Sequence, residues 1–189
     1  MQLDMLSGEL VDLNVVERED LPLITQWLND LEFVGDFEPF DQTSLAATER
    51  QFENLKDKDW FVVSAKDGTK VGFGCTFRAQ SAFGLGYMFV PEARGKGYGT
   101  ETVMILVDYV FLHRDVPRVQ AEIHPDNVAS HRVLEKAGFE KEGILRARFF
   151  SRGVWRDTAM FSITRKEWGS PKVLPLGHVS GTSHSESPK

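Results

Sequence analysis

The chain has 189 residues, of which 41% are hydrophobic and 26% charged, and its formal net charge at pH 7 is -6. This length allows one domain with one sizeable core, and the composition is ordinary for a globular protein. This net negative charge argues against the basic surface expected of a nucleic-acid-binding protein, and it weakly favours cationic partners such as amines.

Cysteine, histidine and apolar residues restrict the compartment and the metal content. The single cysteine, Cys75, allows no internal disulfide and no cysteine-rich zinc site, which fits a reducing cytosol. The histidines show no spacing typical of metal ligands. The first residues lack a signal-peptide pattern, and no apolar run approaches the ~20 residues that span a bilayer. We therefore expect a cytoplasmic monomer or homodimer that binds no metal, no nucleic acid and no membrane.

Two helices are predicted before the main part of the sheet. Apolar and polar residues alternate over 10–16, as in an opening strand. A helix should begin after Asp20, because apolar residues recur at three- and four-residue spacing from Leu21 to Leu31. A second helix is predicted over 45–55, with Ser44 as its N-cap.

Strands and a long helix are predicted in the middle of the chain. Residues 60–65 and an alternating strand over 71–77 flank the turn signal Asp67-Gly68, which indicates a hairpin. Another apolar strand covers 85–90. The apolar segment 103–112 is too long for a typical strand, so it predicts a helix packed deeply on the sheet.

The last third of the ordered chain predicts a strand, a helix and a closing hairpin. The strand covers 118–124, and the helix covers 127–136. The hairpin consists of 145–151 and 154–164 around the turn Arg152-Gly153.

These elements predict one α/β domain followed by a tail. Strands alternate with helices over 1–168, which is typical of layered α/β proteins. From Gly169 onward, Gly, Ser, Pro, His and Lys dominate without any period. We therefore expect residues 169–189 to be a disordered tail.

The glycine-rich loop after the strand 85–90 is the strongest functional signal. It reads Arg94-Gly95-Lys96-Gly97-Tyr98-Gly99-Thr100 and leads directly into the buried helix. The glycines let backbone N–H groups approach a phosphate, and a helix N-terminus adds about half a positive charge there. Arg94 and Lys96 add side-chain charge. The spacing fits neither a P-loop nor a dinucleotide fingerprint. A plain flexible turn is the alternative. In such a turn the alternating glycines would destabilise the start of the helix, and no bound ligand would offset that cost.

Three motifs in the expected order resemble the GNAT superfamily of N-acetyltransferases, in its RimJ/RimL-like branch. They are the loop 94–99, the helix 127–136 with the following Gly138-Phe139 pair, and the closing stretch from Glu142 to Trp168. The similarity runs from about Leu10 to Trp168. It implies a mixed, mostly antiparallel sheet flanked by helices, with a splayed central strand pair that binds CoA. It also implies direct transfer of acetyl from acetyl-CoA to a primary amine.

The resemblance further implies which residues bind acetyl-CoA. The pantetheine arm would lie along the backbone of Met88, Phe89 and Val90, although their side chains alone would fit ordinary core. Asn127 would contact the pantetheine and also cap its helix. The phosphates would lie on the loop residues Arg94, Gly95, Lys96, Gly97, Tyr98, Gly99 and Thr100.

Two residues are implied as the catalytic base and acid. Glu122 matches the general base of RimI-like enzymes, and strand alternation places it on one face with Gln120 and His124; a solvated strand carboxylate is the alternative. Ser130 matches a serine proposed to protonate the leaving thiolate in RimL-like enzymes, and the alternative is a helix residue that bonds back to the backbone. The tyrosine that many members use is replaced by Leu134, so Ser130 is the predicted acid.

The acceptor is an amine whose identity is less constrained. Glu38 and Asp41, in the loop between the first two helices, lie where the family builds its acceptor pocket, although loop acids without a role are the alternative. The resemblance favours a protein or peptide N-terminus. A small cationic amine, such as a polyamine, an amino acid or an antibiotic, is the second candidate. The missing tyrosine also leaves open a CoA-binding sensor that has lost catalysis.

Overall fold

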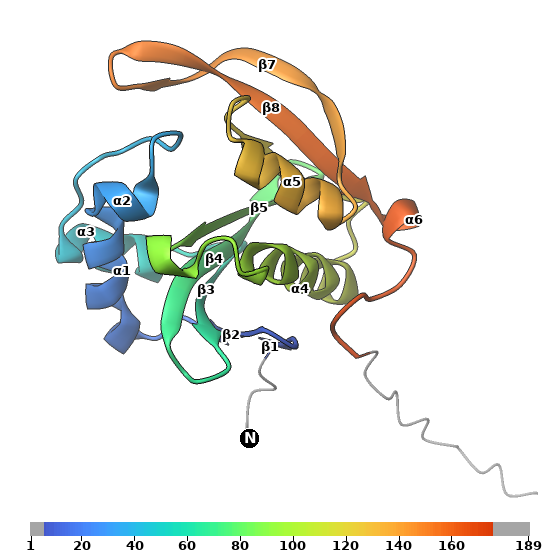
Figure 1. Cartoon of the computed structure of the whole chain (residues 1–189), viewed down its shortest axis with the longest axis horizontal. Coiled ribbons are helices and arrows are strands. Elements are labelled where there is room, and N and C mark those ends of the chain that lie inside the picture. Colours follow the sequence, from blue (N-terminus) through green and yellow to red (C-terminus); the bar gives the residue numbers. More distant parts are fainter. Residues whose placement is uncertain (1–5, 176–189) are drawn as a thin grey trace, which may run out of the picture.

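The computed structural model describes residues 6–175, which are built around one sheet (Figure 1). Within these residues the strand order is β1-β2-β3-β4-β5-β6-β8-β7, and β5–β6 is the parallel pair in an otherwise antiparallel sheet. The strands are β1 (Leu6–Ser7), β2 (Val11–Val15), β3 (Lys58–Ala65), β4 (Lys70–Ala79), β5 (Ala82–Phe89), β6 (Arg118–Ile123), β7 (Glu140–Ser151) and β8 (Val154–Thr164). The helices are η1 (Arg18–Asp20), α1 (Leu21–Leu28), α2 (Leu31–Val34), α3 (Leu45–Glu53), η2 (Pro91–Ala93), α4 (Tyr98–His113), α5 (Val128–Lys136) and α6 (Arg165–Trp168).

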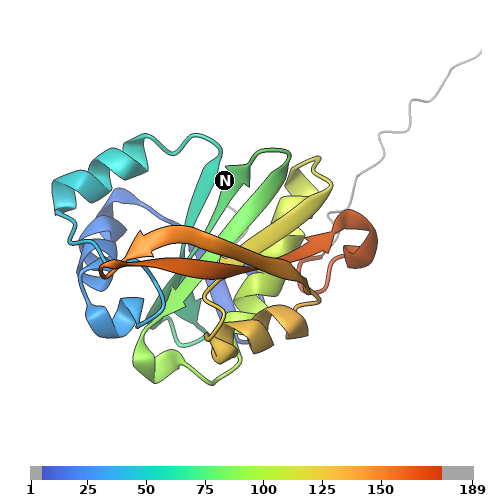
Figure 2. The same ribbon diagram turned by 90° about the horizontal axis from the view of Figure 1, so that it is seen from above.

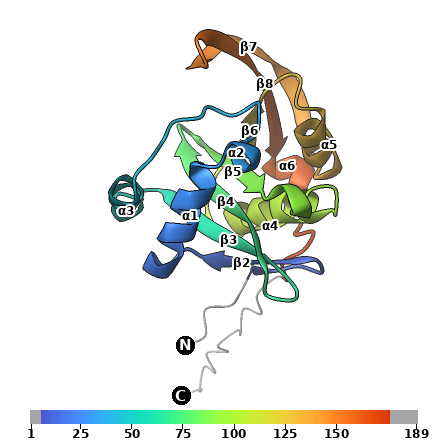
Figure 3. The same ribbon diagram turned by 60° about the vertical axis from the view of Figure 1, so that its left-hand side comes forward.

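Helices cover both faces of this sheet. In Figure 3, α1, α2 and α3 lie on one side of the sheet, and α4 and α5 lie on the other. The apolar helix α4 is deeply packed, with Val103 and Leu106 fully buried against the strands. On the opposite face, the stacked rings of Trp27 and Phe33, 5.0 Å apart, belong to a second apolar cluster. The predicted fold class is therefore confirmed.

The central strands β5 and β6 separate after a short contact. They pair only at Phe83 with Val119 and at Gly84 with Gln120. β5 then continues to Phe89 without a partner on its β6 side, as the resemblance predicted. Backbone groups on that edge are consequently left without strand hydrogen bonds, and such groups need another partner.

The β7–β8 hairpin crosses the end of the sheet where β5 and β6 separate. Seen from above, it runs from α6 toward the helices at the start of the chain (Figure 2). At its tip, Arg152 donates a hydrogen bond to the Gly35 carbonyl at 3.0 Å and lies 3.6 Å from Asp36. Beneath it, the rings of Phe37 and His124 are 5.0 Å apart. The hairpin and the loop after α2 therefore contact each other and cover the end of β6.

The first helices differ from their predicted form. The helix predicted to reach Leu31 ends at Leu28, and α2 begins separately because the Asp30 side chain caps it. Asp20 precedes α1 but does not cap it with its side chain. The 3₁₀ turn η1 runs directly into α1, and the Asp20 carboxylate instead accepts a hydrogen bond from Lys70 at 2.6 Å.

The packed chain extends beyond the domain boundary predicted at residue 168. Backbone N–H groups of residues 172–174 donate to the Asp108 carboxylate of α4 at 2.7 to 3.1 Å. Trp168 Nε1 donates to the same carboxylate at 2.7 Å, and Leu174 is buried. The prediction of a disordered tail from Gly169 is therefore wrong for these residues, because a buried acid on α4 holds them. The rest of the predicted tail, 176–189, lies outside the described residues.

Candidate active site

The glycine-rich loop lies at the N-terminus of α4. Gly95 and Gly97 have positive φ angles of 74° and 88°, which favour glycine. Glu101 N–H donates to the Gly97 carbonyl at 3.2 Å, so the N–H groups of 98–100 precede the helical hydrogen bonds and have no acceptor within the helix. A Cβ at position 95 would meet nothing within 4 Å. The loop is thus open, and its free N–H groups fit a phosphate.

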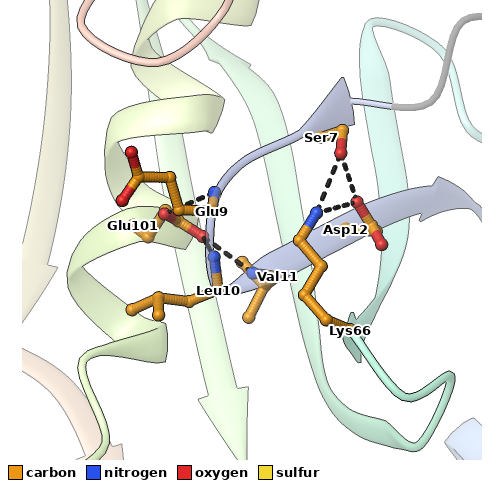
Figure 4. A network of polar contacts seen from close by, with 7 residues as sticks. All are labelled: Ser7, Glu9, Leu10, Val11, Asp12, Lys66 and Glu101. Carbon is orange, nitrogen blue, oxygen red and sulfur yellow. Dashed lines mark hydrogen bonds and ion pairs between the residues drawn. The ribbon is translucent and has the colours of Figure 1, made fainter.

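The first turn of α4 also fixes the N-terminal segment (Figure 4). The Glu101 carboxylate accepts hydrogen bonds from the N–H groups of Glu9, Leu10 and Val11 at 2.7 to 2.9 Å. These bonds place Leu10 beside Gly97, where a Cβ would approach the leucine side chain to 3.1 Å. Both the backbone angle and the neighbouring side chain therefore select glycine at position 97.

Arg94 differs from its predicted side-chain role. Its Nε donates to the Phe89 carbonyl at 3.1 Å, and its Nη2 donates to the carbonyls of Glu32 and Phe33 at 2.6 and 3.0 Å. The guanidinium therefore ties α2 to the end of β5, because the last carbonyls of a helix lack partners within it. Lys96 is exposed on the loop and remains the basic side chain available to a phosphate.

The start of α5 lies beside the open half of β5. Asn127 caps α5, as predicted, because its side chain accepts a hydrogen bond from the Ser130 N–H at 3.1 Å. Ser130 is half-buried, and its side chain approaches Tyr87 of β5. Burial raises the pKa of Tyr87 to about 12, and Ser130 opposes that rise. Met88, the next residue, packs with the opposite apolar cluster, since successive side chains of a strand point to opposite faces.

A pocket of about 320 Å³ lies between the end of β6, the β7–β8 hairpin and the loop after α2. Glu122 lines it, on the face that strand alternation predicted. Its two carboxylate oxygens accept hydrogen bonds from Nε and Nη2 of Arg148 at 2.8 and 3.0 Å. Glu122 is therefore paired with a guanidinium, a partner that the sequence did not indicate. Phe37, Phe149 and Thr158 contribute to the walls of the same pocket.

A second pocket, of about 340 Å³, shares Glu38 with the first. Asp41 and Gln51 line it on one side, and Met88 of β5 lines it on the other. Glu38 is half-buried, and this burial raises the pKa of its carboxyl group. Within residues 6–175 the carboxylate makes no hydrogen bond. Glu38 thus lies at the junction of the two pockets, whereas Asp41 is exposed and lines only the second.

The predicted site residues form two groups on opposite faces of β5. The glycine-rich loop, Asn127 and Ser130 lie on the face covered by α4 and α5. Glu38 and Asp41 lie on the other face, which α1–α3 cover. Sequence patterns did not indicate Arg148 as a site residue, because it lies 26 residues from Glu122 in the sequence and on a different strand. Tyr87 was also missed, although an aromatic hydroxyl in an otherwise apolar strand is a signal that could have identified it.

The described residues offer neither a reactive cysteine nor a metal-binding cluster nor a membrane-spanning helix. Burial raises the pKa of the Cys75 thiol to about 11, so it stays protonated at neutral pH and is a poor nucleophile. Among residues 6–175, no group of three or more His, Cys, Asp or Glu side chains is arranged to hold a metal ion. In that same part of the chain, no helix has the length and apolarity needed to cross a membrane.

An α/β sheet that splays beside a glycine-rich helix N-terminus, with acidic pockets on the opposite face, defines the class of acetyl-CoA-dependent N-acetyltransferases. A model of the Acetyltransferase (GNAT) domain matches residues 11–140, and the chain belongs to this family. The protein is therefore an enzyme of this class, and the alternative of a sensor without catalysis is not supported.

Relatives and solved structures agree with this assignment. The probable N-acetyltransferase YjcK of Bacillus subtilis is 38% identical over 123 residues, which cover 61% of this chain and 67% of the relative. The ribosomal protein uS5-alanine N-acetyltransferase of Escherichia coli is 31% identical over 84 residues, 44% of this chain and 43% of that protein.

Two solved structures have a similar fold at low identity. Spermidine N-acetyltransferase from Vibrio cholerae, in complex with CoA and spermine, superposes with a TM-score of 0.73 at 21% identity, over 85% of this chain and 98% of that one. Mycobacterium smegmatis RimJ, in complex with a CoA disulfide, superposes with a TM-score of 0.74 at 24% identity, over 86% of this chain and 85% of that one. Both of these structures hold CoA or a CoA disulfide, and their similarity shows that this chain shares their fold.

Proposed function

We propose that this enzyme transfers acetyl from acetyl-CoA to the α-amino group of a protein or peptide N-terminus. The observation that carries this proposal is the position of Arg148 in the acceptor-side pocket. An N-terminal residue presents an amine next to a carbonyl, so its pocket needs an acid and a hydrogen-bond donor together. A polyamine presents further cations instead of a carbonyl, and a guanidinium would repel them.

Arg148 and Thr158 provide the donors for an acceptor carbonyl. Arg148 uses Nε and Nη2 for Glu122, and within residues 6–175 its Nη1 makes no hydrogen bond. The Thr158 hydroxyl is buried and also has no partner in the described chain. Buried polar groups without a partner are uncommon in folded proteins, so Thr158 favours a polar ligand in this pocket. Arg148 is exposed, and its Nη1 can reach a ligand there without being buried.

Glu38 accepts the proton that the attacking amine loses, and Glu122 orients Arg148. Glu38 touches both pockets, and its raised pKa moves it toward the range in which a carboxylate works as a base at neutral pH. An α-amino group with a pKa of ~7.7–8.0 is partly unprotonated at that pH, whereas a lysine-like amine near ~10.4 is not. The amine forms a bond to the acetyl carbon, the carbon–sulfur bond breaks, and Ser130 donates a hydrogen bond to the departing thiolate.

A polyamine is the second candidate acceptor. The second pocket supports it, because Glu38 and Asp41 line this pocket and none of its lining residues is basic. The two candidates therefore place the acceptor differently, with a peptide extending past Arg148 and a polyamine extending past Asp41.

An acceptor panel followed by mass spectrometry tests the proposal. A peptide with a free α-amine should be acetylated with a kcat/KM at least about tenfold above spermidine and above the same peptide with a blocked N-terminus and a free lysine, a gap of about 1.4 kcal/mol. A preference for spermidine would replace the proposed acceptor with the second candidate.

Arg148→Gln separates the two acceptors further. Loss of a hydrogen bond from a charged donor costs about 1.5–3 kcal/mol, so KM for the peptide should rise about tenfold or more while KM for spermidine stays the same or falls. Arg146→Gln is the matched control, because Arg146 is exposed on the same strand and does not line either pocket. An equal effect of both variants would contradict a direct contact with Arg148.

A further inference from the structure

The hydroxyl of Tyr87 is a buried polar group that no residue of the described chain satisfies. It belongs to β5, beyond the last residue that pairs with β6. Its oxygen is removed from solvent, and within residues 6–175 it makes no hydrogen bond. A hydroxyl buried without a partner costs folding free energy, and in native structures such a group usually has a ligand or water as its partner.

The side chains around this hydroxyl place it at the opening between β5 and β6. The Tyr87 and Phe89 rings lie on the same face of β5, 6.4 Å apart, and pack with the core under α4. Ser130, in the first turn of α5, lies close enough to the phenol to lower its pKa as a hydrogen-bond partner would, although the two hydroxyls do not reach the geometry of a hydrogen bond. The negative charge of Glu38 also acts on the phenol. The hydroxyls of Tyr87 and Ser130 thus lie close together at the opening between β5 and β6, and the acceptor-side acid Glu38 acts electrostatically on the phenol.

We propose that Tyr87 is a catalytic residue whose hydroxyl donates a hydrogen bond to the negative charge that develops on the thioester during transfer. This proposal rests on the acetyl transfer of the proposed function and assigns the donor for that step. Amine attack forms the nitrogen–carbon bond and breaks the carbon–sulfur bond, and the electron pair leaves with sulfur. The amine proton goes to Glu38, and the thiolate takes its proton from water after release.

The phenol acts as a hydrogen-bond donor and keeps its own proton. Burial raises its pKa to about 12, whereas an ordinary thiol has a pKa near ~8.5. Full proton transfer from Tyr87 to the thiolate would therefore be unfavourable. A fixed donor in a site closed to water is nevertheless effective, because it stabilises developing charge without reorganisation.

The test is Tyr87→Phe, which keeps the ring and removes only the oxygen. We expect kcat to fall about 10²-fold, as for other donors of this kind, while the Kd for acetyl-CoA changes less than about twofold. The thermal midpoint should stay equal or rise, because a buried hydroxyl without a partner is removed. A lower midpoint with unchanged kcat would overturn the proposal and assign the residue to packing.

The pH dependence distinguishes a donor from a proton source. The ratio of wild-type to Tyr87→Phe kcat should be constant from pH 6 to about 9, because the phenol titrates far above this range. A ratio that falls on the basic side would show proton transfer by Tyr87 and overturn the proposal. Tyr109→Phe is the control, since Tyr109 lies on α4 with its ring against Phe61 and away from the opening; its kcat should equal wild type.

The comparison uses the fastest acceptor of either class, so its outcome is independent of the preference for α-amines. If spermidine is preferred, the proposed acceptor fails while the Tyr87 test proceeds unchanged. If no amine in the panel reacts, hydrolysis of acetyl-CoA gives the same comparison, because water attack places the same charge on the thioester.

Discussion

A half-buried carboxylate that accepts no hydrogen bond costs folding free energy when it is charged, and Glu38 is such a group. Burial raises its pKa in the folded protein above the ordinary value of 4.5. Below pH 4.5 Glu38 is protonated in both the folded and the unfolded protein, and the free-energy cost of burying its charge vanishes. As the pH rises through the folded-state pKa, the group ionises in a poorly hydrated position and stability is lost.

Glu38→Gln should therefore stabilise the protein while it impairs catalysis. At pH 7 we expect a higher thermal midpoint, with about 2–4 °C for each 1 kcal/mol gained, and this gain should disappear near pH 4. Loss of the base should lower kcat/KM by about 10²-fold and remove the acidic limb of its pH profile. Differential scanning fluorimetry at several pH values and steady-state kinetics measure the two effects.

Asp41→Asn is the matched control for Glu38, because Asp41 is exposed and lines only the second pocket. Its thermal midpoint should not change with pH in the same way. If Glu38→Gln lowers the midpoint at pH 7, or leaves the acidic limb in place, the carboxylate is not the strained base that we infer, and Glu122 becomes the first alternative.

At the scale of elements, sequence patterns were sufficient to predict a feature wherever its residues are adjacent in the sequence. The strand, glycine-rich loop and helix around Gly95 could be predicted because glycine spacing and a continuous apolar helix are properties of one segment. The partners of Glu122 and Asp108 could not, since each contact joins elements brought together only by the fold. Arg94 shows the same limit: its loop position was predicted correctly, but its guanidinium binds carbonyls of α2.

The loop itself can be tested with two glycines that both have a positive φ angle. Gly95 and Gly68 have φ angles of 74° and 86°, and at both positions a Cβ would meet nothing within 4 Å. Valine at either site should cost similar stability, because the positive φ is unfavourable for it. Only Gly95→Val should weaken acetyl-CoA binding, by about tenfold or more, since only this side chain would block the loop N–H groups.

Isothermal titration with acetyl-CoA checks this difference, and thermal unfolding checks that the strain is matched. Gly68 lies in the turn between β3 and β4, so Gly68→Val should bind acetyl-CoA as wild type does. Equal affinities for the two variants would mean that the phosphates bind elsewhere.

At the scale of the whole molecule, the buried Asp108 connects α4 to the end of the described chain. The helix that begins at the glycine-rich loop is the one whose carboxylate holds Trp168 and residues 172–174. An acid in this position is stabilised by the N–H groups that it accepts, and breaking a buried charged network is among the most destabilising changes known. The C-terminal segment thus supports the helix on which the loop is built.

A chain ending at Ser170 should consequently be much less stable than one ending at Pro175. The shorter chain loses three N–H donors to Asp108 and the buried Leu174. Removing partners of a buried charge costs about 3–5 kcal/mol, which corresponds to a fall of about 6–20 °C in thermal midpoint at this size. The chain ending at Pro175 keeps every one of these contacts and should unfold at the wild-type temperature.

If Asp108→Asn is combined with the shorter chain, part of the loss in thermal midpoint should be recovered, because the amide carries no charge to leave unpaired. Equal midpoints for the chains ending at 170 and 175 would show that Asp108 needs only Trp168, and would restore the boundary at residue 168.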